Sequence, residues 1–493
     1  MNYKRQLRDL LNEKRRDRNE IYKITKKFLK KEGELFLNGK EAYFYHREKK
    51  ELFCILQKPF KQYLATELHF DRGDQLFTRV INHLEDVAYR GKNQISFHKF
   101  AFYDEKVGKL YVNQFGGSMY VLDGKKSEMM PVGVDGVFFN DPEYCEPYEY
   151  VESKGDLANK YLFRKKNFNE KGNVLSAKDQ EFVLRSWVYS IFFRSLLPTK
   201  PILVIFGPPD SFKTETARAI LIFLFGSQAD VNDPPETTRD LKVIANANHI
   251  LFLDDFDHAN KNLEKHLVRI STGMKAEERE YYTNKGVSIT KPNVFVGITA
   301  KSPYFSREDF LQRSLIIRLD STTGNISSDR VKKKILKHRN RIWSDVLENL
   351  NKMVFRINRN KSKMPEKVDF RMADWAQFLL SSNRRNDLDV IRKVLSRINK
   401  SQIQFLIEAN PLASALNKWL RDKNNLGLSI SSGKLRKQLN AIAVKEDLDF
   451  KTYENNQVFG SEMANVASIF RRRYDVFSEY RRGRTYYSFD KKK

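Results

Sequence analysis

A strand that runs directly into a glycine turn and then a helix is the feature that most constrains the fold. Residues 202–206 are all apolar, and they are followed by the segment Gly207-Pro208-Pro209-Asp210-Ser211-Phe212-Lys213-Thr214. A helical pattern continues from residue 215 to residue 225. Backbone N–H groups at a helix N-terminus bind phosphate oxygens, so this order predicts a phosphate-binding loop. We expect Lys213 to reach the β- and γ-phosphates of a nucleotide and the Thr214 hydroxyl to bind Mg²⁺.

One position departs from the usual loop pattern G-x-x-x-x-G-K-[ST]. Phe212 stands where the second glycine is expected. Glycine allows close approach of the backbone to phosphate and any value of φ. Phe212 is expected to serve if its φ is helical and its ring points away from the ligand. The alternative is a decayed loop that no longer binds nucleotide.

A second apolar strand, residues 250–253, ends in two carboxylates, Asp254 and Asp255. A carboxylate at the C-terminal end of a neighbouring strand can hold Mg²⁺ through water, and a second can orient or deprotonate the attacking water. We therefore assign Asp254 to the metal and Asp255 to the general-base position. The cofactors expected at this site are ATP and Mg²⁺.

A third apolar strand, residues 293–299, precedes an arginine-containing segment, residues 306–313. Thr299 is the nearest candidate for a polar sensor of the γ-phosphate. Arg313 stands where a ring ATPase places the arginine that completes a neighbour's site, and Arg307 is a second candidate for nucleotide contact. The alternative for each arginine is a surface ion pair.

Charge and length restrict the partners and the number of domains. The chain has 493 residues, and Lys+Arg of 89 against Asp+Glu of 62 gives 89 − 62 = +27. That surplus is typical of a protein that binds nucleic acid, although a lysine-rich solvated surface would also produce it. Cys54 and Cys145 form no CxxC pair, and no apolar run reaches about 20 residues. We expect a cytoplasmic protein of about three domains, with no cysteine zinc site and no membrane span.

The N-terminal part of the chain shows no catalytic constellation. Residues 1–33 predict one or two amphipathic helices that end near Gly33, and residues 33–140 read as short strands with tight turns. We expect residues 1–150 to form a helical and β-rich accessory domain. It lacks the clustered carboxylates that a primase would need.

The C-terminal region predicts three helices followed by a basic hairpin. The expected helices cover residues 411–421 and 432–443, and a third begins at an N-cap Ser461. The arginines predicted to bind DNA here are Arg471, Arg472, Arg473, Arg481, Arg482 and Arg484. This order is similar to a winged helix that contacts the DNA backbone, or alternatively one that binds protein.

The ordered motifs of residues 200–380 resemble those of a known group of ATPases. The loop at residues 207–214 is similar to that of superfamily 3 viral helicases. The longer array resembles the helicase-type AAA+ ATPases of phages, plasmids and integrative elements, including pox-type primase-helicases. It comprises residues 238–241, 245–248, 254–255, 271–273, 279–283, 307–313 and 370–376, with Pro292.

The resemblance implies an α/β P-loop AAA+ core at residues 151–325, a helical lid at 326–400 and the winged helix at 401–493. It also implies a hexameric or similar ring that hydrolyses ATP and moves on DNA. Relatives have a hairpin at the place of residues 279–290 that projects into the central pore, so Lys285 at its tip is the residue expected to follow the DNA. The alternative is an edge hairpin with an exposed lysine. Phe212 and Lys301, which stands where relatives often have a sensor asparagine, are the two departures.

The function expected from these features is an ATP-dependent DNA helicase for replication of a mobile genetic element. One alternative is a DNA-binding initiator or adaptor whose nucleotide site no longer hydrolyses ATP. Another is an ATPase switch in genome defence or transposition.

Overall fold

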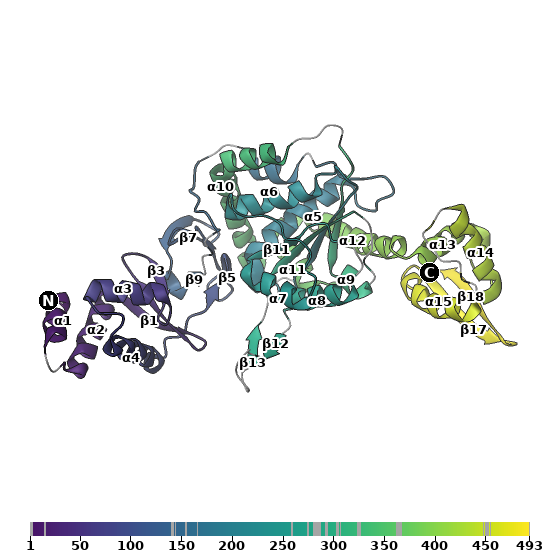
Figure 1. Ribbon diagram of the computed structural model, residues 1–493. Helices are drawn as coiled ribbons and strands as arrows, with labels where there is room; N and C mark the ends of the chain where they lie inside the picture. The colour runs from purple at the N-terminus through teal and green to yellow at the C-terminus, as the bar shows by residue number, and fades with distance from the viewer. Residues whose placement is uncertain are drawn as a thin grey trace. The chain divides into compact units, whose positions relative to one another are not determined.

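The fold is a mixed arrangement of helices and sheets, seen in a computed structural model (Figure 1). The structure describes residues 3–13, 16–139, 142, 144–152, 155–164, 166–257, 260–273, 276–279, 287–290, 294–301, 305, 307–322, 327–360, 367–446, 448, 453 and 455–492. The chain divides into two compact units. Unit 1 comprises Met1–Ser153 with Val346–Phe355, and unit 2 comprises Lys154–Asp345 with Arg356–Lys493.

Unit 1 begins with helices packed on a small antiparallel sheet. The helices are α1 (Tyr3–Asn12), α2 (Arg18–Glu32), α3 (Lys58–Leu68) and α4 (Gln75–Gly91). The sheet has the order β1-β2-β3 and consists of β1 (Gly33–Asn38), β2 (Glu41–His46) and β3 (Glu51–Cys54). Apolar side chains from both layers, among them Phe28, Phe44 and Leu84, form one buried cluster.

The rest of unit 1 is a four-stranded antiparallel meander with a short parallel pair beside it. The meander has the order β5-β6-β7-β8 and consists of β5 (Ala101–Asp104), β6 (Lys109–Asn113), β7 (Ser118–Leu122) and β8 (Ser127–Pro131). The pair is β4 (Phe97–His98) with β9 (Phe138–Phe139).

Helices α3 and α4 correct the prediction that residues 33–140 contain strands alone. Asp74 caps α4 by accepting a hydrogen bond from the backbone N–H of Leu76 at 2.8 Å. Along α4 the buried residues Phe77, Val80, Ile81 and Leu84 recur at helical spacing and bury one face. The helical period was therefore present in the sequence between the strands.

Unit 2 is built on a four-stranded parallel sheet. Its strands are β10 (Ile202–Phe206), β11 (Ile250–Leu253), β14 (Phe295–Ala300) and β15 (Ser314–Arg318), in the order β11-β14-β10-β15. The connecting helices are α6 (Lys213–Phe225), α7 (Thr238–Ala247), α8 (Lys261–Ser271) and α9 (Glu308–Leu311). Helix α5 (Ala177–Ser190) precedes β10. The predicted alternation of strands and helices is confirmed for this part of the chain.

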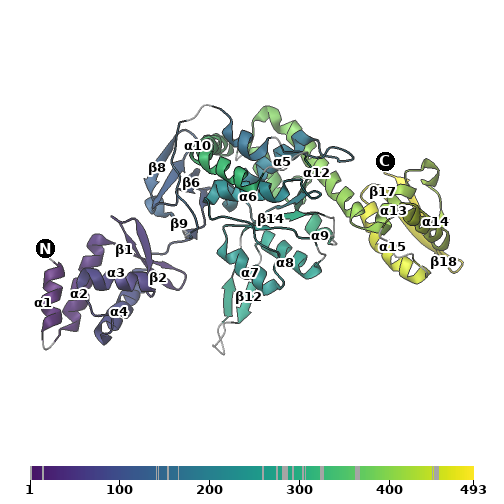
Figure 2. The same ribbon diagram turned by 45° about the horizontal axis from the view of Figure 1, so that its top comes forward.

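Both faces of the parallel sheet are covered, which accounts for the unbroken apolar runs of its strands. On one face, Ile202 and Val204 share a buried cluster with residues of α7, α8 and α9. On the other face, the Trp187 indole of α5 lies edge-on to Phe252 and Phe295. Figure 2 shows α7 and α8 together on one side of the sheet, away from α5 and α6.

Long helices follow the sheet. They are α10 (Ser328–Asn360), α11 (Ala373–Ser382) and α12 (Leu388–Glu408). Within unit 2, Arg339 and Trp343 of α10 both donate hydrogen bonds to the carbonyl of Phe223, at 3.0 and 2.9 Å. These donors satisfy a carbonyl in the last turn of α6, which would otherwise lack a partner inside the protein.

A C-terminal module of three helices and a three-stranded sheet completes unit 2. Its helices are α13 (Pro411–Trp419), α14 (Ser432–Lys445) and α15 (Asn456–Phe470), and its strands are β16 (Ile430–Ser431), β17 (Tyr474–Arg481) and β18 (Arg484–Lys491). Ser461 was expected to cap the third helix, but it lies inside α15. Asn455 is the cap, because its side chain accepts from the backbone N–H groups of Gln457 and Val458.

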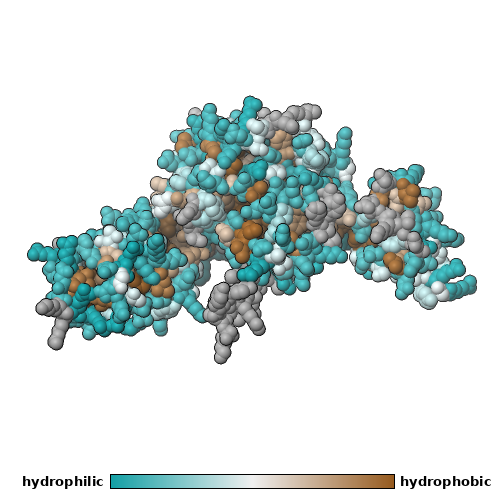
Figure 3. Space-filling model, in the orientation of Figure 1, coloured by the Kyte–Doolittle hydropathy of each residue, from teal (hydrophilic) through white to brown (hydrophobic). Residues whose placement is uncertain are grey.

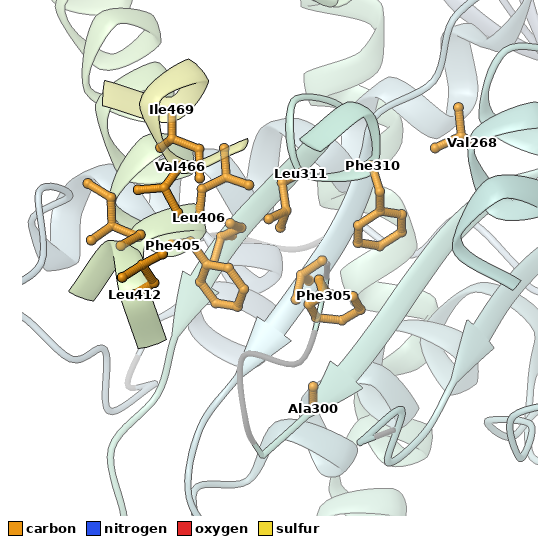
Figure 4. Close-up of a cluster of buried hydrophobic side chains, with 14 of the residues drawn as sticks. Val268, Ala300, Phe305, Phe310, Leu311, Phe405, Leu406, Leu412, Val466 and Ile469 are labelled. Carbon is orange, nitrogen blue, oxygen red and sulfur yellow. The ribbon is translucent and has the colours of Figure 1, made fainter. Parts of the chain in front are cut away.

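The module packs on α9 and α12 through apolar side chains. Figure 4 shows Val466 and Ile469 of the module close to Leu406 of α12, with Leu311 of α9 nearby. Two polar contacts join the same elements: Arg472 pairs with Glu308 of α9, and Arg473 donates to the carbonyl of Lys400 at 3.5 Å.

Two paired strands border the predicted hairpin of residues 279–290, of which residues 280–286 lie outside the described part of the chain. β12 (Ala276–Arg279) and β13 (Val287–Thr290) are antiparallel, with Arg279 opposite Val287. They extend away from the parallel sheet in both ribbon views (Figures 1 and 2). Lys285 lies outside the described residues.

Hydrophilic residues dominate the face of the molecule in Figure 3, and the apolar patches there are small and separate. Among the described residues, every helix is too short or too polar to cross a bilayer.

Candidate nucleotide site

The loop of residues 207–212 lies at the carboxyl edge of the parallel sheet, where the strand order reverses. β10 is bonded to β14 on one side and to β15 on the other, while the next strand along the chain, β11, lies beyond β14. In open parallel sheets, ligands bind at such a switch point. The loop leads directly into α6, so its backbone N–H groups lie at a helix N-terminus.

Phe212 has a backbone conformation that favours glycine. Its φ is 57° and its ψ is 28°, so it lies in the left-handed region. The helical φ that was set as a condition for Phe212 is therefore not met. The Phe212 carbonyl accepts hydrogen bonds from the backbone N–H of Thr216 at 3.0 Å and from its hydroxyl at 2.8 Å. A residue other than glycine is strained in the left-handed region, and these two hydrogen bonds stabilise Phe212 there.

The loop has the close packing and the unsatisfied polar group that suit a phosphate. A Cβ on Gly207 would lie 2.6 Å from both the Leu319 carbonyl and Ser211 Oγ, so only glycine fits there. Ser211 Oγ is buried, and no described residue forms a hydrogen bond with it. Thr322 N donates to the Asp210 carbonyl at 3.2 Å and ties the loop to the segment after β15. The residues present therefore fit a bound phosphate group.

The side chains expected to serve one metal are brought together. Thr214 Oγ1 donates to Asp254 Oδ1 at 2.8 Å, and Thr299 Oγ1 donates to the same oxygen. Thr299 is fully buried, and its hydroxyl also accepts from the backbone N–H of Asp255 at 2.9 Å. Lys213 is 6% exposed, and its ammonium lies 3.5 Å from the Pro208 carbonyl, folded over the loop. The ends of β10, β11 and β14 thus supply an ammonium, two hydroxyls and a carboxylate to one site.

Asp255 faces a lysine that the motif does not anticipate. Lys301 Nζ lies 3.3 Å from Asp255 Oδ2 and 3.5 Å from Asp257 Oδ2. The hydrogen bond to Asp255 raises the pKa of Lys301, so the ammonium remains charged at neutral pH. The backbone N–H of Lys301 also donates to Asp257 Oδ1 at 2.6 Å. Asp255 has a φ of 48°, a second strained residue at this edge of the sheet.

The two candidate arginines contact their own chain around α9. Arg307 pairs with Asp309 at 2.9 Å, which raises the pKa of Arg307. Arg313 donates to the Asp309 carbonyl at 2.8 Å. Burial, and then the positive charge of Arg371, lower the pKa of Arg313. Both guanidinium groups therefore have partners or burial within their own chain.

Residues 172–398 match a family of replication proteins. The family is described as "Actinomycete integrative conjugative element replication protein". The matched segment includes the loop, both carboxylates and both candidate arginines, and it ends within α12. No curated protein matches the chain.

Two solved structures show weak similarity to this chain. "The A form apo structure of NrS-1 C terminal region-CTR" has a TM-score of 0.42 at 10% identity and covers 95% of this chain and 98% of that chain. A JCV helicase with a bound acetamide compound has a TM-score of 0.21 at 14% identity and covers 50% and 72%. TM-scores this low do not establish a shared fold, so the family match carries the comparison.

The arginines predicted to bind DNA fall into three groups. Arg471 lies exposed at the C-terminal end of α15. Arg472 and Arg473 contact α9 and α12, and burial lowers the pKa of Arg473. Arg481, Arg482 and Arg484 lie exposed at the end of the β17–β18 hairpin, where Arg481 pairs with Glu479.

Two residues that support the site structurally were not predicted from the sequence. Glu264 of α8 is fully buried and accepts from the backbone N–H of Arg307 at 2.9 Å, which fixes the start of α9. Asp257 shares Lys301 with Asp255. Asp257 lies two residues after Asp255, and this spacing could have identified it as a further candidate. The role of Glu264 depends on a contact with a residue 43 positions away, which the sequence does not reveal.

Proposed function

We propose that this chain is an ATP-dependent DNA helicase that acts in the replication of a mobile genetic element. In this proposal unit 2 is an AAA+ P-loop core with a helical lid, and the C-terminal module is a winged helix. The observation that carries the proposal is the contact between Thr214 and Asp254, with Lys213 beside Thr214 at the start of α6. The match of residues 172–398 to replication proteins of integrative elements supports the biological setting.

Each side chain then has a chemical role. The loop N–H groups and Lys213 hold the phosphates, while Thr214 and Asp254 hold Mg²⁺, which supplies charge neutralisation on the phosphate oxygens. Thr299 fixes the orientation of the Asp254 carboxylate through its hydrogen bond. Asp255 would orient the attacking water and accept its proton, and Lys301, which pairs with Asp255, would respond to the charge of the terminal phosphate.

The proposed assembly is a ring, with a hexamer as the expected size. In a ring, Arg307 and Arg313 would reach the phosphates bound by a neighbouring subunit. The β12–β13 hairpin, with Lys285 at its tip, is proposed to follow one DNA strand through the pore.

A second candidate function is supported by the Lys301 contact. Since the ammonium pairs with both Asp255 and Asp257, the general base is engaged by a cation. A chain in which that pair persists with ATP bound would bind nucleotide without hydrolysing it. It would then act as a DNA-binding initiator or adaptor.

ATP turnover with and without single-stranded DNA separates the two functions. The helicase proposal predicts turnover that DNA stimulates and that Lys213→Ala lowers by at least about 100-fold. Lys171→Ala, which removes an exposed lysine outside the loop, is the matched control and should leave turnover unchanged. Turnover no greater than that of Lys213→Ala, with DNA binding retained, would overturn the helicase proposal and favour the initiator.

A further inference from the structure

The hairpin of β17 and β18 carries an exposed aromatic side chain at its tip. The turn consists of Arg482 and Gly483, whose φ values of 49° and 75° fit a tight two-residue turn. Tyr480 lies one residue before the last pair of the ladder and is 74% exposed. Covering so exposed an aromatic ring with a partner would remove apolar surface from water, which is favourable.

Tyr480 continues the face of the hairpin that packs on the module. Directly opposite residues of an antiparallel ladder share a face, and the pairs on this face are Val476 with Phe489, Ser478 with Tyr487, and Tyr480 with Thr485. Phe489 and Tyr487 are buried at 0% and 5% exposure. On this face the side chains near the base of the hairpin are therefore buried, whereas Tyr480 near the tip is exposed. The tip extends beyond the helices of the module (Figure 1).

The charge around Tyr480 indicates what would cover it. Arg482 and Arg484 are exposed, and no ion pair to either one occurs within the part of the chain that the structure describes. Arg481 shares its charge with Glu479. A ring flanked by two uncompensated guanidinium groups suits a partner that has flat aromatic faces between phosphates, which is the chemistry of a nucleic-acid strand.

We infer that the β17–β18 tip binds unpaired bases at the junction of single-stranded and duplex DNA. Tyr480 stacks on one exposed base, while Arg482 and Arg484 contact the flanking phosphates. Bases inside a duplex are already stacked on both faces, so a ring can stack only at an end, a gap or a fork. This inference rests on the proposed function for DNA binding itself, and it adds the structure of the DNA that the module prefers.

Binding of the full-length chain to three DNAs, without nucleotide, tests the inference. The DNAs are a forked duplex, a blunt duplex of the same paired sequence and a single strand. A 2-aminopurine base placed next to the fork reports stacking by its fluorescence, and anisotropy reports the Kd. The wild-type chain should bind the fork more tightly than the blunt duplex and change the 2-aminopurine signal.

The variants separate stacking from electrostatic attraction. Tyr480→Ala should weaken fork binding by about tenfold, leave duplex binding within about twofold and abolish the 2-aminopurine change. Tyr480→Phe should retain the wild-type values, since it keeps the ring. Phe477→Ala is the matched control, because Phe477 is 59% exposed on the opposite face of the same strand, and it should change fork binding by less than about twofold.

The outcomes distinguish this inference from the proposed function. Equal binding of fork and blunt duplex, or a Tyr480→Ala variant that binds the fork as the wild type does, overturns the stacking role while DNA binding stands. An equal loss in Phe477→Ala also overturns it, because the effect would not belong to the tip. A chain that binds none of the three DNAs overturns the proposed function as well.

Discussion

The loop after β10 and the end of β14 each carry one departure from the expected motif, and the two differ in kind. Phe212 changes the side chain but keeps the left-handed backbone that glycine would adopt, and its carbonyl is held by Thr216. Lys301, directly after β14, adds a charge that pairs with Asp255 and Asp257.

This difference shows which substitutions an active site of this type tolerates. The loop binds phosphate through backbone N–H groups, so a new side chain there is tolerated as long as φ and ψ are kept. The end of β14 acts through side chains, so a new charge there changes the interactions of a catalytic group. We therefore expect Lys301 to influence the rate of hydrolysis far more than Phe212 does.

The largest effect is expected from the carboxylate that Lys301 contacts. Asp255→Asn should lower ATP turnover by at least about 100-fold, because a general base contributes about 10²–10⁴-fold, while ATP binding is retained. Steady-state kinetics with a direct binding measurement checks this. Asp257→Asn is the control, with an expected fall of less than about threefold. If Asp257→Asn shows the larger loss, the assignment of Asp255 as the base is wrong.

A smaller effect is expected from Lys301 itself. In the proposed helicase Lys301 would donate a charge-assisted hydrogen bond to the reacting phosphate, so Lys301→Ala should lower kcat by about tenfold with KM nearly unchanged. Lys301→Asn should recover part of the loss, since an amide can still donate. A rise in kcat for Lys301→Ala would instead show that the ammonium restrains Asp255, as the initiator function requires.

The smallest effect is expected at Phe212. Phe212→Gly should change the Kd for ATP by less than about threefold, because the backbone already has the conformation that glycine would adopt. Phe212→Val should bind ATP more weakly, since a β-branched residue is disfavoured at positive φ. Isothermal titration calorimetry of both variants measures their Kd for ATP and checks both predictions. A gain of more than tenfold for Phe212→Gly would show that the Phe212 ring obstructs the site.

The elements of unit 2 could be predicted because its strands are continuous apolar runs between turns. The same pattern gave the candidate residues Lys213, Asp254 and Thr299, since parallel strands end at one edge of a sheet. Helices α3 and α4 were missed because their helical period lies between strands. The φ of Phe212 could not be predicted, because sequence specifies a residue type and not the strain that its neighbours impose.

Contacts between distant segments were the other limit on prediction. The sequence alone does not distinguish Arg472, which pairs with Glu308, from Arg482, which is exposed at the hairpin tip. Both belong to arginine-rich runs of similar composition. Only the packing of α15 on α9 and α12 distinguishes a structural arginine from one that is available to DNA.

Strand displacement on a forked duplex is the most direct test of the proposed function. A labelled strand is paired with a partner, each strand carrying an unpaired tail, and its release is followed with the purified chain. We expect release with ATP and Mg²⁺, and none with a non-hydrolysable ATP analogue or with Lys213→Ala. ATP turnover that DNA stimulates, without release from forks of either tail polarity, would contradict the helicase function.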